Sequence, residues 1–433
     1  MPYGYTFFDS IIVIIASLLA LYAALKVPGR LMLFLPAMLS VYVFIPFLTL
    51  LRLSDIVSII LFGVIVIQGK FFFPGGVKQS IQILLLIFAL ELIASIIIGD
   101  TVFLRIIIRT MSYVGLLGLF LFSWQECQNK NNYELLIRGV AIIALIHATY
   151  GVYQIVASKT GLPFRGIVRD IYDVQVAYEG DLLRINGLAD EPKRLGYLLA
   201  AGSFAFFELA RQLSNTQRAM LLRLFGIGVF GVSVLTFSGS YFLAAGFAGG
   251  LIMLLRPPNM KFLAVIASLI ICFGIVFAGS VSQLVNSVLT GFERRVDEVE
   301  LGLDGKVVYR QEFFAQQFLE QNPITIITGV GIGRSNKALN TAFGDGAGLD
   351  DIYLLPLNSG FFQLIFDMGI VGTLLIYSAL LVIIIRAWRQ KEIFIVQILV
   401  LLGIQSFTII VMQYLVVFMG AALARISADK KAY

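Results

Sequence analysis

Arginine and carboxylate side chains gather just before one apolar segment of this chain. Arg184 and Arg194 flank Asp190, Glu191 and Pro192. A guanidinium binds phosphate oxygens through a planar fork of N–H donors and keeps its charge, whereas a carboxylate can take a proton from a hydroxyl. This spacing indicates a site for an anionic ligand in which Arg184 and Arg194 face a phosphate and Glu191 acts as a base.

The same residues also suit a simple helix start. Pro192 fits the first helical turn, where its missing N–H costs nothing, and Asp190 and Glu191 would lie at the positive end of the helix dipole. In that interpretation the basic side chains extend to the polar edge of the membrane. The residues alone leave both interpretations open.

A second candidate region begins at Arg310. Apolar residues recur at helical spacing after it, and Asn322-Pro323 ends the run. Gly329, Gly331 and Gly333 follow. They lack the flanking strand and helix of a nucleotide-binding loop, so a tight turn at which backbone approaches another element is the better interpretation.

Other polar residues lie within or beside apolar segments. Arg105 and Arg109 are four apart and share one helix face, so they either extend to the membrane surface or line a pocket for a lipid diphosphate. His147 lies among apolar residues, which favours a hydrogen bond between helices over catalysis. Asn358 and Ser359 are good N-cap residues before another apolar segment.

Membrane spans must position these residues. The chain has 433 residues, of which 59% are hydrophobic and 13% charged, with a mean hydropathy of +0.92. Soluble domains carry about 25% charged residues, so a soluble enzyme, a secreted disulfide scaffold and a disordered chain are excluded. Cys127 and Cys272 are too few for a disulfide framework or a metal site.

Apolar windows predict an all-α, polytopic membrane protein with twelve or thirteen transmembrane helices. The segment 393–424 is too long for one untilted helix and tight for two, so a long span, a short pair and a re-entrant hairpin all fit. The predicted spans lie near 7–25, 31–51, 54–68, 80–98, 101–123, 134–157, 192–210, 219–237, 240–255, 262–282, 357–385 and 393–424.

Basic residues cluster on one side of these spans, which the positive-inside rule makes cytoplasmic. The net charge of +6 therefore indicates membrane orientation and no nucleic-acid partner. The predicted cytoplasmic residues are Lys26, Arg30, Lys70, Lys78, Lys130, Arg211, Arg218, Arg223, Arg256, Lys261, Arg386, Arg389 and Lys391. Among the short connections of the other side, Arg52 is the main basic residue.

Two long segments fall on the extracytoplasmic side, and we expect short helices in both. The chain then divides into helices in 1–157, a loop in 158–191, helices in 192–282, a larger acidic loop in 283–356, and helices with a cytoplasmic tail in 357–433. Long loops of ordinary composition are usually functional, so the chemistry is expected there.

Taken together, these motifs resemble the bacterial O-antigen polymerase and ligase family of integral-membrane glycosyltransferases. The resemblance extends over about residues 100–385. Its elements are the segment from Arg184 to Pro192, the Thr236-Phe-Ser238 turn, the Arg310 helix, the glycine turn, and the segment from Asn358 to Gly369. Ligase members carry a histidine where this chain has Leu357 and an arginine where it has Gly239, whereas Glu191-Pro192 is similar to the polymerase branch.

The resemblance implies an enzyme of the bacterial inner membrane that polymerises lipid-linked oligosaccharide repeat units on its outer face. Its partners would be polyprenyl-diphosphate-linked donor and acceptor glycans, the bilayer and a chain-length regulator, with no cofactor, nucleotide or metal. Glu191 and Arg310 would be catalytic. The substrate-binding residues would be Arg184, Arg194, Arg105, Arg109 and Asn358. An O-antigen ligase and an exporter of lipid-linked glycans are the alternatives.

Overall fold

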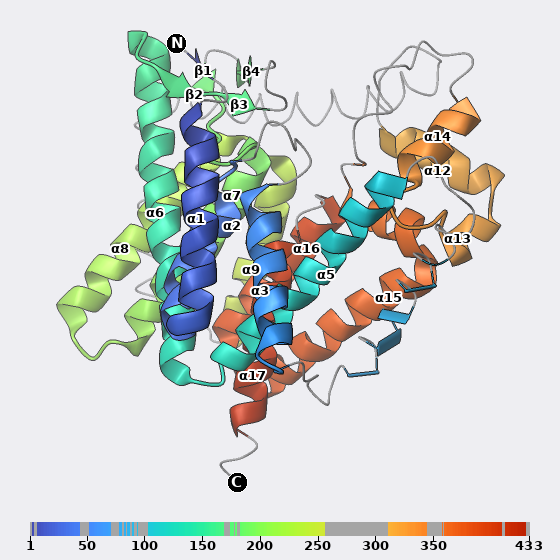
Figure 1. Cartoon of the computed structure of the whole chain (residues 1–433). Helices are drawn as coiled ribbons and strands as arrows, with labels where there is room; N and C mark the ends of the chain where they lie inside the picture. The colour runs from blue at the N-terminus through green and yellow to red at the C-terminus, as the bar shows by residue number, and fades with distance from the viewer. Residues whose placement is uncertain are drawn as a thin grey trace.

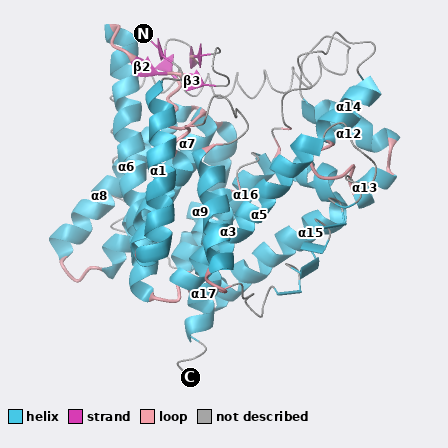
Figure 2. Cartoon of the chain, viewed as in Figure 1, coloured by secondary structure: helices cyan, strands magenta, loops and turns pink. Residues whose placement is uncertain are grey.

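Helices make up most of the described residues in the computed structural model (Figure 1). Short strand pairs are the other regular elements of the described residues (Figure 2). The structure describes residues 2–3, 7–43, 52–70, 103–168, 174–176, 178–179, 182–255, 311–343, 357, 359–408 and 412–429, with scattered helical positions between 78 and 93.

Five helices precede the first long loop. They are α1 (Phe7–Lys26), α2 (Pro28–Ser40), α3 (Leu53–Ile67), α5 (Phe103–Glu126) and α6 (Lys130–Thr160). The side chain of Asn129 caps the start of α6 by accepting a hydrogen bond from the Asn131 N–H, and Gly161 ends the helix in the left-handed conformation.

The middle and C-terminal helices follow the two loops. They are α7 (Pro192–Gln212), α8 (Thr216–Ser233) with a 3₁₀ turn η2 (Val234–Thr236), α9 (Gly239–Leu255), α12 (Gln311–Gln321), α13 (Ile324–Thr328), α14 (Ser335–Phe343), α15 (Gly360–Arg389), α16 (Ile393–Thr408) and α17 (Gln413–Asp429). The predicted N-cap Ser359 accepts a hydrogen bond from the Phe362 N–H at the start of α15.

The structure is that of an all-α, membrane-embedded protein. Five helices within the described ranges are long and apolar enough to cross a membrane, namely Phe7–Lys26, Ile106–Glu126, Lys130–Thr160, Thr216–Thr236 and Gly360–Arg389. The shorter apolar helices are Leu53–Ile67, Tyr241–Gly250, Ile393–Phe407 and Gln413–Ser427. The total of twelve or thirteen spans remains a prediction, and the span expected at 262–282 lies outside the described residues.

The loops differ in part from expectation. The described part of the second loop contains the short helices α12, α13 and α14, and α12 ends directly before Asn322-Pro323 as predicted. The described part of the first loop contains strand pairs where helices were expected. Its strands are β2 (Phe164–Arg165), β3 (Ile167–Val168), β4 (Val174–Gln175), β5 (Tyr178–Glu179) and β6 (Leu182–Leu183), and β1 (Pro2–Tyr3) pairs with β2. Pairs of two residues carry no readable alternation, so the pattern did not indicate them.

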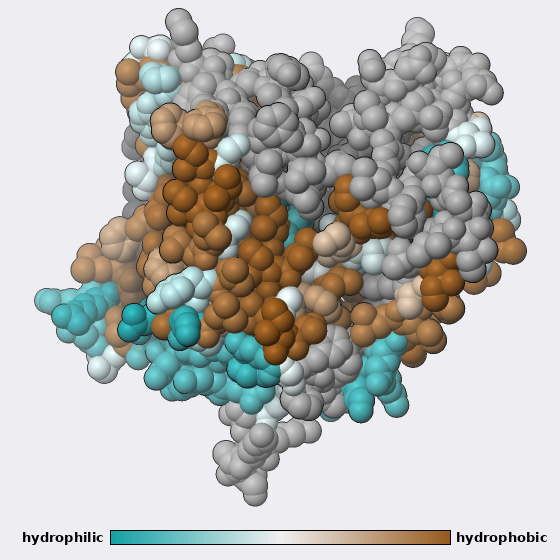
Figure 3. All heavy atoms as spheres, in the orientation of Figure 1, coloured by the Kyte–Doolittle hydropathy of each residue, from teal (hydrophilic) through white to brown (hydrophobic). Residues whose placement is uncertain are grey.

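The described turns that carry predicted cytoplasmic residues lie at one end of the bundle (Figure 1), whereas Arg256 and Lys261 lie outside the described residues. The turns after α1, α5, α7 and α15 lie at the lower end in Figure 1, where Figure 3 shows hydrophilic surface. There the Arg425 guanidinium lies 5.6 Å from the centre of the Tyr133 ring, and Asn132 donates a 3.0 Å hydrogen bond to Glu126. The first loop and α12–α14 lie toward the opposite end, which we call the loop end.

Close helix crossings hold the main core together. A Cβ atom on Gly202 of α7 would collide with the side chain of Ala144 of α6, and one on Gly139 would collide with the Leu33 carbonyl of α2. Small residues at such crossings let helix backbones approach, as expected for packing in a membrane. A separate small core joins α12 and α14 to the start of α15 through Ala315, Leu319, Leu339, Ile365 and Phe366.

Candidate functional site

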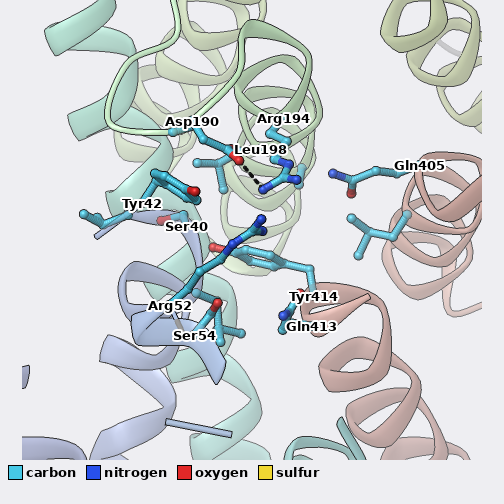
Figure 4. A pocket seen from close by; sticks show the side chains of 15 residues that line it. Ser40, Tyr42, Arg52, Ser54, Asp190, Arg194, Leu198, Gln405, Gln413 and Tyr414 are labelled. Atoms are coloured by element: carbon cyan, nitrogen blue, oxygen red, sulfur yellow. Dashed lines mark ion pairs between the residues drawn. The ribbon is translucent and has the colours of Figure 1, made fainter. Parts of the chain in front are cut away.

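A cavity of about 50 Å³ lies at the loop end of the bundle, where α2 ends and α3, α7 and α17 begin (Figure 4). That volume is room for roughly four water molecules. Part of its lining is apolar. Its polar lining consists of Ser40, Tyr42, Arg52, Ser54, Asp190, Arg194, Gln405 and Gln413.

Arg194 enters this cavity from the first turn of α7. The Pro192 start of α7 is confirmed, and it places Asp190 and Arg194 one turn apart, where they form an ion pair. The Nε atom of Arg194 is buried and has no hydrogen-bond partner among the described residues. A buried donor without a partner is costly, so a ligand oxygen that reached this N–H would be stabilised there.

Arg52 reaches the cavity from the start of α3. Its guanidinium lies 5.1 Å from the centre of the Tyr42 ring, and in Figure 4 the side chains of Arg52 and Arg194 point toward one another. Burial lowers the pKa of Arg52, but the charges of nearby groups raise it by more, so the net pKa lies above its ordinary value. These groups are Tyr42 and the carboxylates of Asp190, Asp55 and Glu191. Arg52 thus stays charged.

Gln413 supplies the complementary feature. Its Nε2 donates a 3.2 Å hydrogen bond to Asp55, whereas its buried Oε1 has no partner in the described part of the chain. Two residues of the cavity lining, Arg194 and Gln413, therefore carry a donor and an acceptor that have no partner in the described part of the chain. This combination suits a ligand that carries both an anionic oxygen and a hydroxyl.

Glu191 is the N-cap residue of α7 with extended backbone, but its side chain does not cap the helix. The half-buried carboxylate forms no hydrogen bond within the described ranges, and it is close enough to Arg52 to raise that residue's pKa. It does not belong to the cavity lining, whereas Asp190 does. Two adjacent carboxylates thus lie close enough to Arg52 to raise its pKa, and one of them, Asp190, pairs with Arg194.

Arg184 lies away from the cavity lining. Its Nε donates to the carbonyl oxygen of Thr236 at 3.3 Å, and the Ile185 N–H donates to the Leu235 carbonyl at 3.2 Å. These contacts bring together the Arg184 segment and the turn at Thr236, two motifs that lie far apart in the sequence.

Arg109 pairs with Asp367, a partner that neither sequence interpretation included. The Arg109 Nε donates to the buried Asp367 carboxylate at 3.1 Å. That carboxylate also accepts from Tyr113 Oη at 2.6 Å, the Gly333 N–H at 3.1 Å and Gln363 Nε2 at 2.9 Å. The acceptor sites of this carboxylate are used by groups of the protein itself, so the cluster stabilises the structure and is not a ligand site.

Some of the remaining predicted residues lie in the described part of the structure and others do not. Arg310 and Asn358 lie outside the described residues, as does the side chain of Arg105. His147 is buried and accepts a 3.3 Å hydrogen bond at Nδ1 from the Leu188 N–H, which agrees with a structural histidine, although the donor lies in the first loop and not in a helix. Within the described ranges no group of three or more His, Cys, Asp or Glu side chains could hold a metal ion.

Arg52 is the main cavity residue that was not selected from the sequence. The sequence could have indicated Arg52, because it is the main basic residue in the short connections of the loop end. Neither the comparison with protein families nor that with curated proteins finds a match for this chain.

Proposed function

We propose that this protein is a membrane glycosyltransferase that polymerises polyprenyl-diphosphate-linked repeat units into O-antigen or capsular polysaccharide. The observation that carries the proposal is the cavity lined by Arg52, Asp190, Arg194 and Gln413. The Nε–H of Arg194 and the Oε1 of Gln413 have no hydrogen-bond partner among the described residues. A sugar joined to a diphosphate offers both the anionic oxygens and the hydroxyls that these groups would bind. The resemblance of the sequence motifs to the polymerase branch supports the same class.

The reaction requires the protein to stabilise the charge of the leaving diphosphate and to accept the proton of the acceptor hydroxyl. The acceptor hydroxyl oxygen forms a bond to the anomeric carbon of the donor, and the bond from that carbon to the diphosphate oxygen breaks. Arg52 and Arg194 stabilise the negative charge of the departing diphosphate. Glu191 or Asp190 takes the hydroxyl proton.

Asp190 can accept the hydroxyl proton only after its ion pair with Arg194 is broken. A diphosphate oxygen that binds Arg194 replaces the carboxylate there and frees it for the proton. Glu191 needs no such exchange, since it has no hydrogen bond to lose in the described part of the chain. Glu191 is therefore the first choice for the base, and Arg310 and Arg184 remain further candidates for contact with the glycan or diphosphate.

The proposal includes the membrane arrangement. Twelve or thirteen spans place the loop end outside the cytoplasm of a bacterial inner membrane, where lipid-linked glycans are available and ATP is not. The partners are the donor and acceptor lipids and a chain-length regulator. No nucleotide or divalent metal takes part.

Reconstitution tests this function. The full chain is placed in liposomes with purified lipid-linked repeat unit, with and without EDTA, and the glycans are separated by size. A ladder of longer glycans on the lipid, unaffected by EDTA, is the expected result. A ladder that is lost with EDTA and restored by magnesium contradicts the metal-free chemistry, and single units moved onto lipid A indicate a ligase.

An exporter of lipid-linked glycans is the second candidate, and one observation favours it. Helix α15 is interrupted at Gly369, next to the buried pair of Asp367 and Arg109. Interrupted helices and ionisable residues within spans are common in transporters. In the same liposomes, an exporter would move the repeat unit across the bilayer without lengthening it.

A further inference from the structure

The short helix α13 presents isoleucine side chains at the protein surface. Ile324 is 70% exposed, Ile326 37% and Ile327 59%. Contiguous exposed apolar residues on an ordered surface mark a site of contact with a partner or a membrane.

Backbone contacts hold α13 in a fixed place beside α15. Gly369 has a φ of 67°, which interrupts α15, and a Cβ atom there would collide with the Ile327 carbonyl oxygen. Just beyond α13, the Val330 N–H donates a 2.7 Å hydrogen bond to the carbonyl oxygen of Phe366. The exposed isoleucines thus lie next to the interruption of α15.

The lipid-facing side of α15 begins at the same level. Val371 is 52% exposed and Leu374 58%, directly after the interruption, and α15 is one of the helices that can cross a membrane. In Figure 3 hydrophobic surface is present where α13 lies in Figure 1. The α13 isoleucines therefore continue the apolar surface of α15 toward the loop end.

Exposed polar residues lie on α12 and α14, the helices before and after α13. Gln316 and Glu320 of α12 are exposed and hydrogen-bonded to each other at 2.9 Å, and Lys337 of α14 is exposed as well. One boundary between apolar and polar surface thus runs between α13 and its neighbours.

We propose that α13 lies in the interfacial region of the bilayer, with Ile324 and Ile327 in contact with lipid, and holds α12 and α14 at the membrane surface. Short apolar segments bind there by burying their apolar side chains at the boundary of headgroups and acyl chains. The inference does not depend on the glycosyl-transfer reaction. It gives the second loop a defined height above the bilayer.

Nitroxide labels test the placement of α13. The full chain, with Cys127 and Cys272 replaced by alanine, receives a labelled cysteine as Ile327→Cys and is placed in nanodiscs of phosphatidylethanolamine and phosphatidylglycerol. Collision with oxygen, which concentrates in lipid, is compared with collision with a water-soluble nickel chelate. Leu374→Cys serves as the lipid-facing control and Gln316→Cys as the water-facing control.

The expected result is an oxygen-to-nickel collision ratio for Ile327→Cys that is close to that of Leu374→Cys and higher than that of Gln316→Cys. A ratio equal to that of Gln316→Cys overturns the proposal. A label shielded from both reagents also overturns it, because protein, such as a second copy, then covers the helix. The exposed positions of all three labels make misfolding improbable, and thermal unfolding of each labelled chain checks it.

Discussion

The Nε atom of Arg109 lies 3.1 Å from a carboxylate oxygen of Asp367, although 258 residues separate the two in the sequence. Because Tyr113, Gly333 and Gln363 also donate to this carboxylate, it joins α5, the glycine turn and α15 at one point.

Replacing Asp367 with alanine should destabilise the protein by roughly 3 kcal/mol, the lower end of the cost of breaking a buried pair, since Arg109 keeps part of its exposure. Thermal unfolding in detergent measures the change. Glu320→Ala on the exposed face of α12 should stay within about 0.5 kcal/mol of the wild type. Equal unfolding temperatures for the two variants would contradict the structural role of Asp367.

Arg52 is expected to contribute directly to turnover. Arg52→Ala should lower the polymerisation rate by about 10²-fold or more, because a preorganised charge opposite the leaving group is lost. Arg52→Lys should recover little, since a point charge cannot reproduce the guanidinium fork. Arg223→Ala, at an exposed arginine of the opposite end, is the matched control and should keep the wild-type rate. A normal rate for Arg52→Ala would remove this residue from the site.

The two carboxylates before α7 can be told apart by amide substitution. If Glu191 is the base, Glu191→Gln should lower the rate by about 10² to 10⁴ while donor binding stays intact. Asp190→Asn should instead weaken its ion pair with Arg194 and alter donor binding. The reverse pattern would assign the base to Asp190, and a normal rate for both variants would move the search to the second loop. Rates and binding are compared at equal amounts of folded protein.

The backbone at Gly369 should tolerate no side chain. Its φ of 67° and ψ of −178° belong to a region almost restricted to glycine, and a Cβ atom would also strike the Ile327 carbonyl. Gly369→Ala should therefore cost about 2 kcal/mol or more. Gly63→Ala, in an open position of α3, should be neutral or stabilise by up to about 1 kcal/mol. Equal unfolding temperatures for Gly369→Ala and Gly63→Ala would contradict the interruption of α15 at Gly369.

Cys127 should resist alkylation in the folded protein. Burial raises the pKa of its thiol, so the reactive thiolate is scarce at pH 8 and becomes available only at more alkaline pH or after unfolding. In a Cys272→Ser chain, maleimide labelling monitored by mass should be slow until detergent denaturation. Rapid labelling of the native protein at pH 8 would show that Cys127 is accessible.

Local signals in the sequence predicted local features well. Pro192 fixed the start of α7, Asn322-Pro323 ended α12, and the three glycines form the expected close turn with φ values of 73°, 100° and 73°. The segment 393–424, for which three arrangements were left open, forms the pair of helices α16 and α17.

Contacts between distant segments could not be predicted in the same way. Arg52 and Arg194 meet only because α3 and α7 pack in one bundle, and no periodicity in either segment encodes that approach. The same holds for Asp367, which was predicted only as part of an apolar segment. The span windows also missed that α2 ends at Ser40, after thirteen residues, where the chain turns to extended backbone at Val41.

The crossings at Gly202 and Gly139 have a mechanical consequence. Where a glycine of one helix lies directly against an atom of its neighbour, the two helices cannot slide or rotate past each other without a collision. The frame of α2, α6 and α7 is therefore stiff, and any movement that admits a bulky ligand must come from the segments attached to it. Such a frame would keep Arg194 at a constant position, so that in the proposed polymerisation each repeat unit would bind beside the same charge.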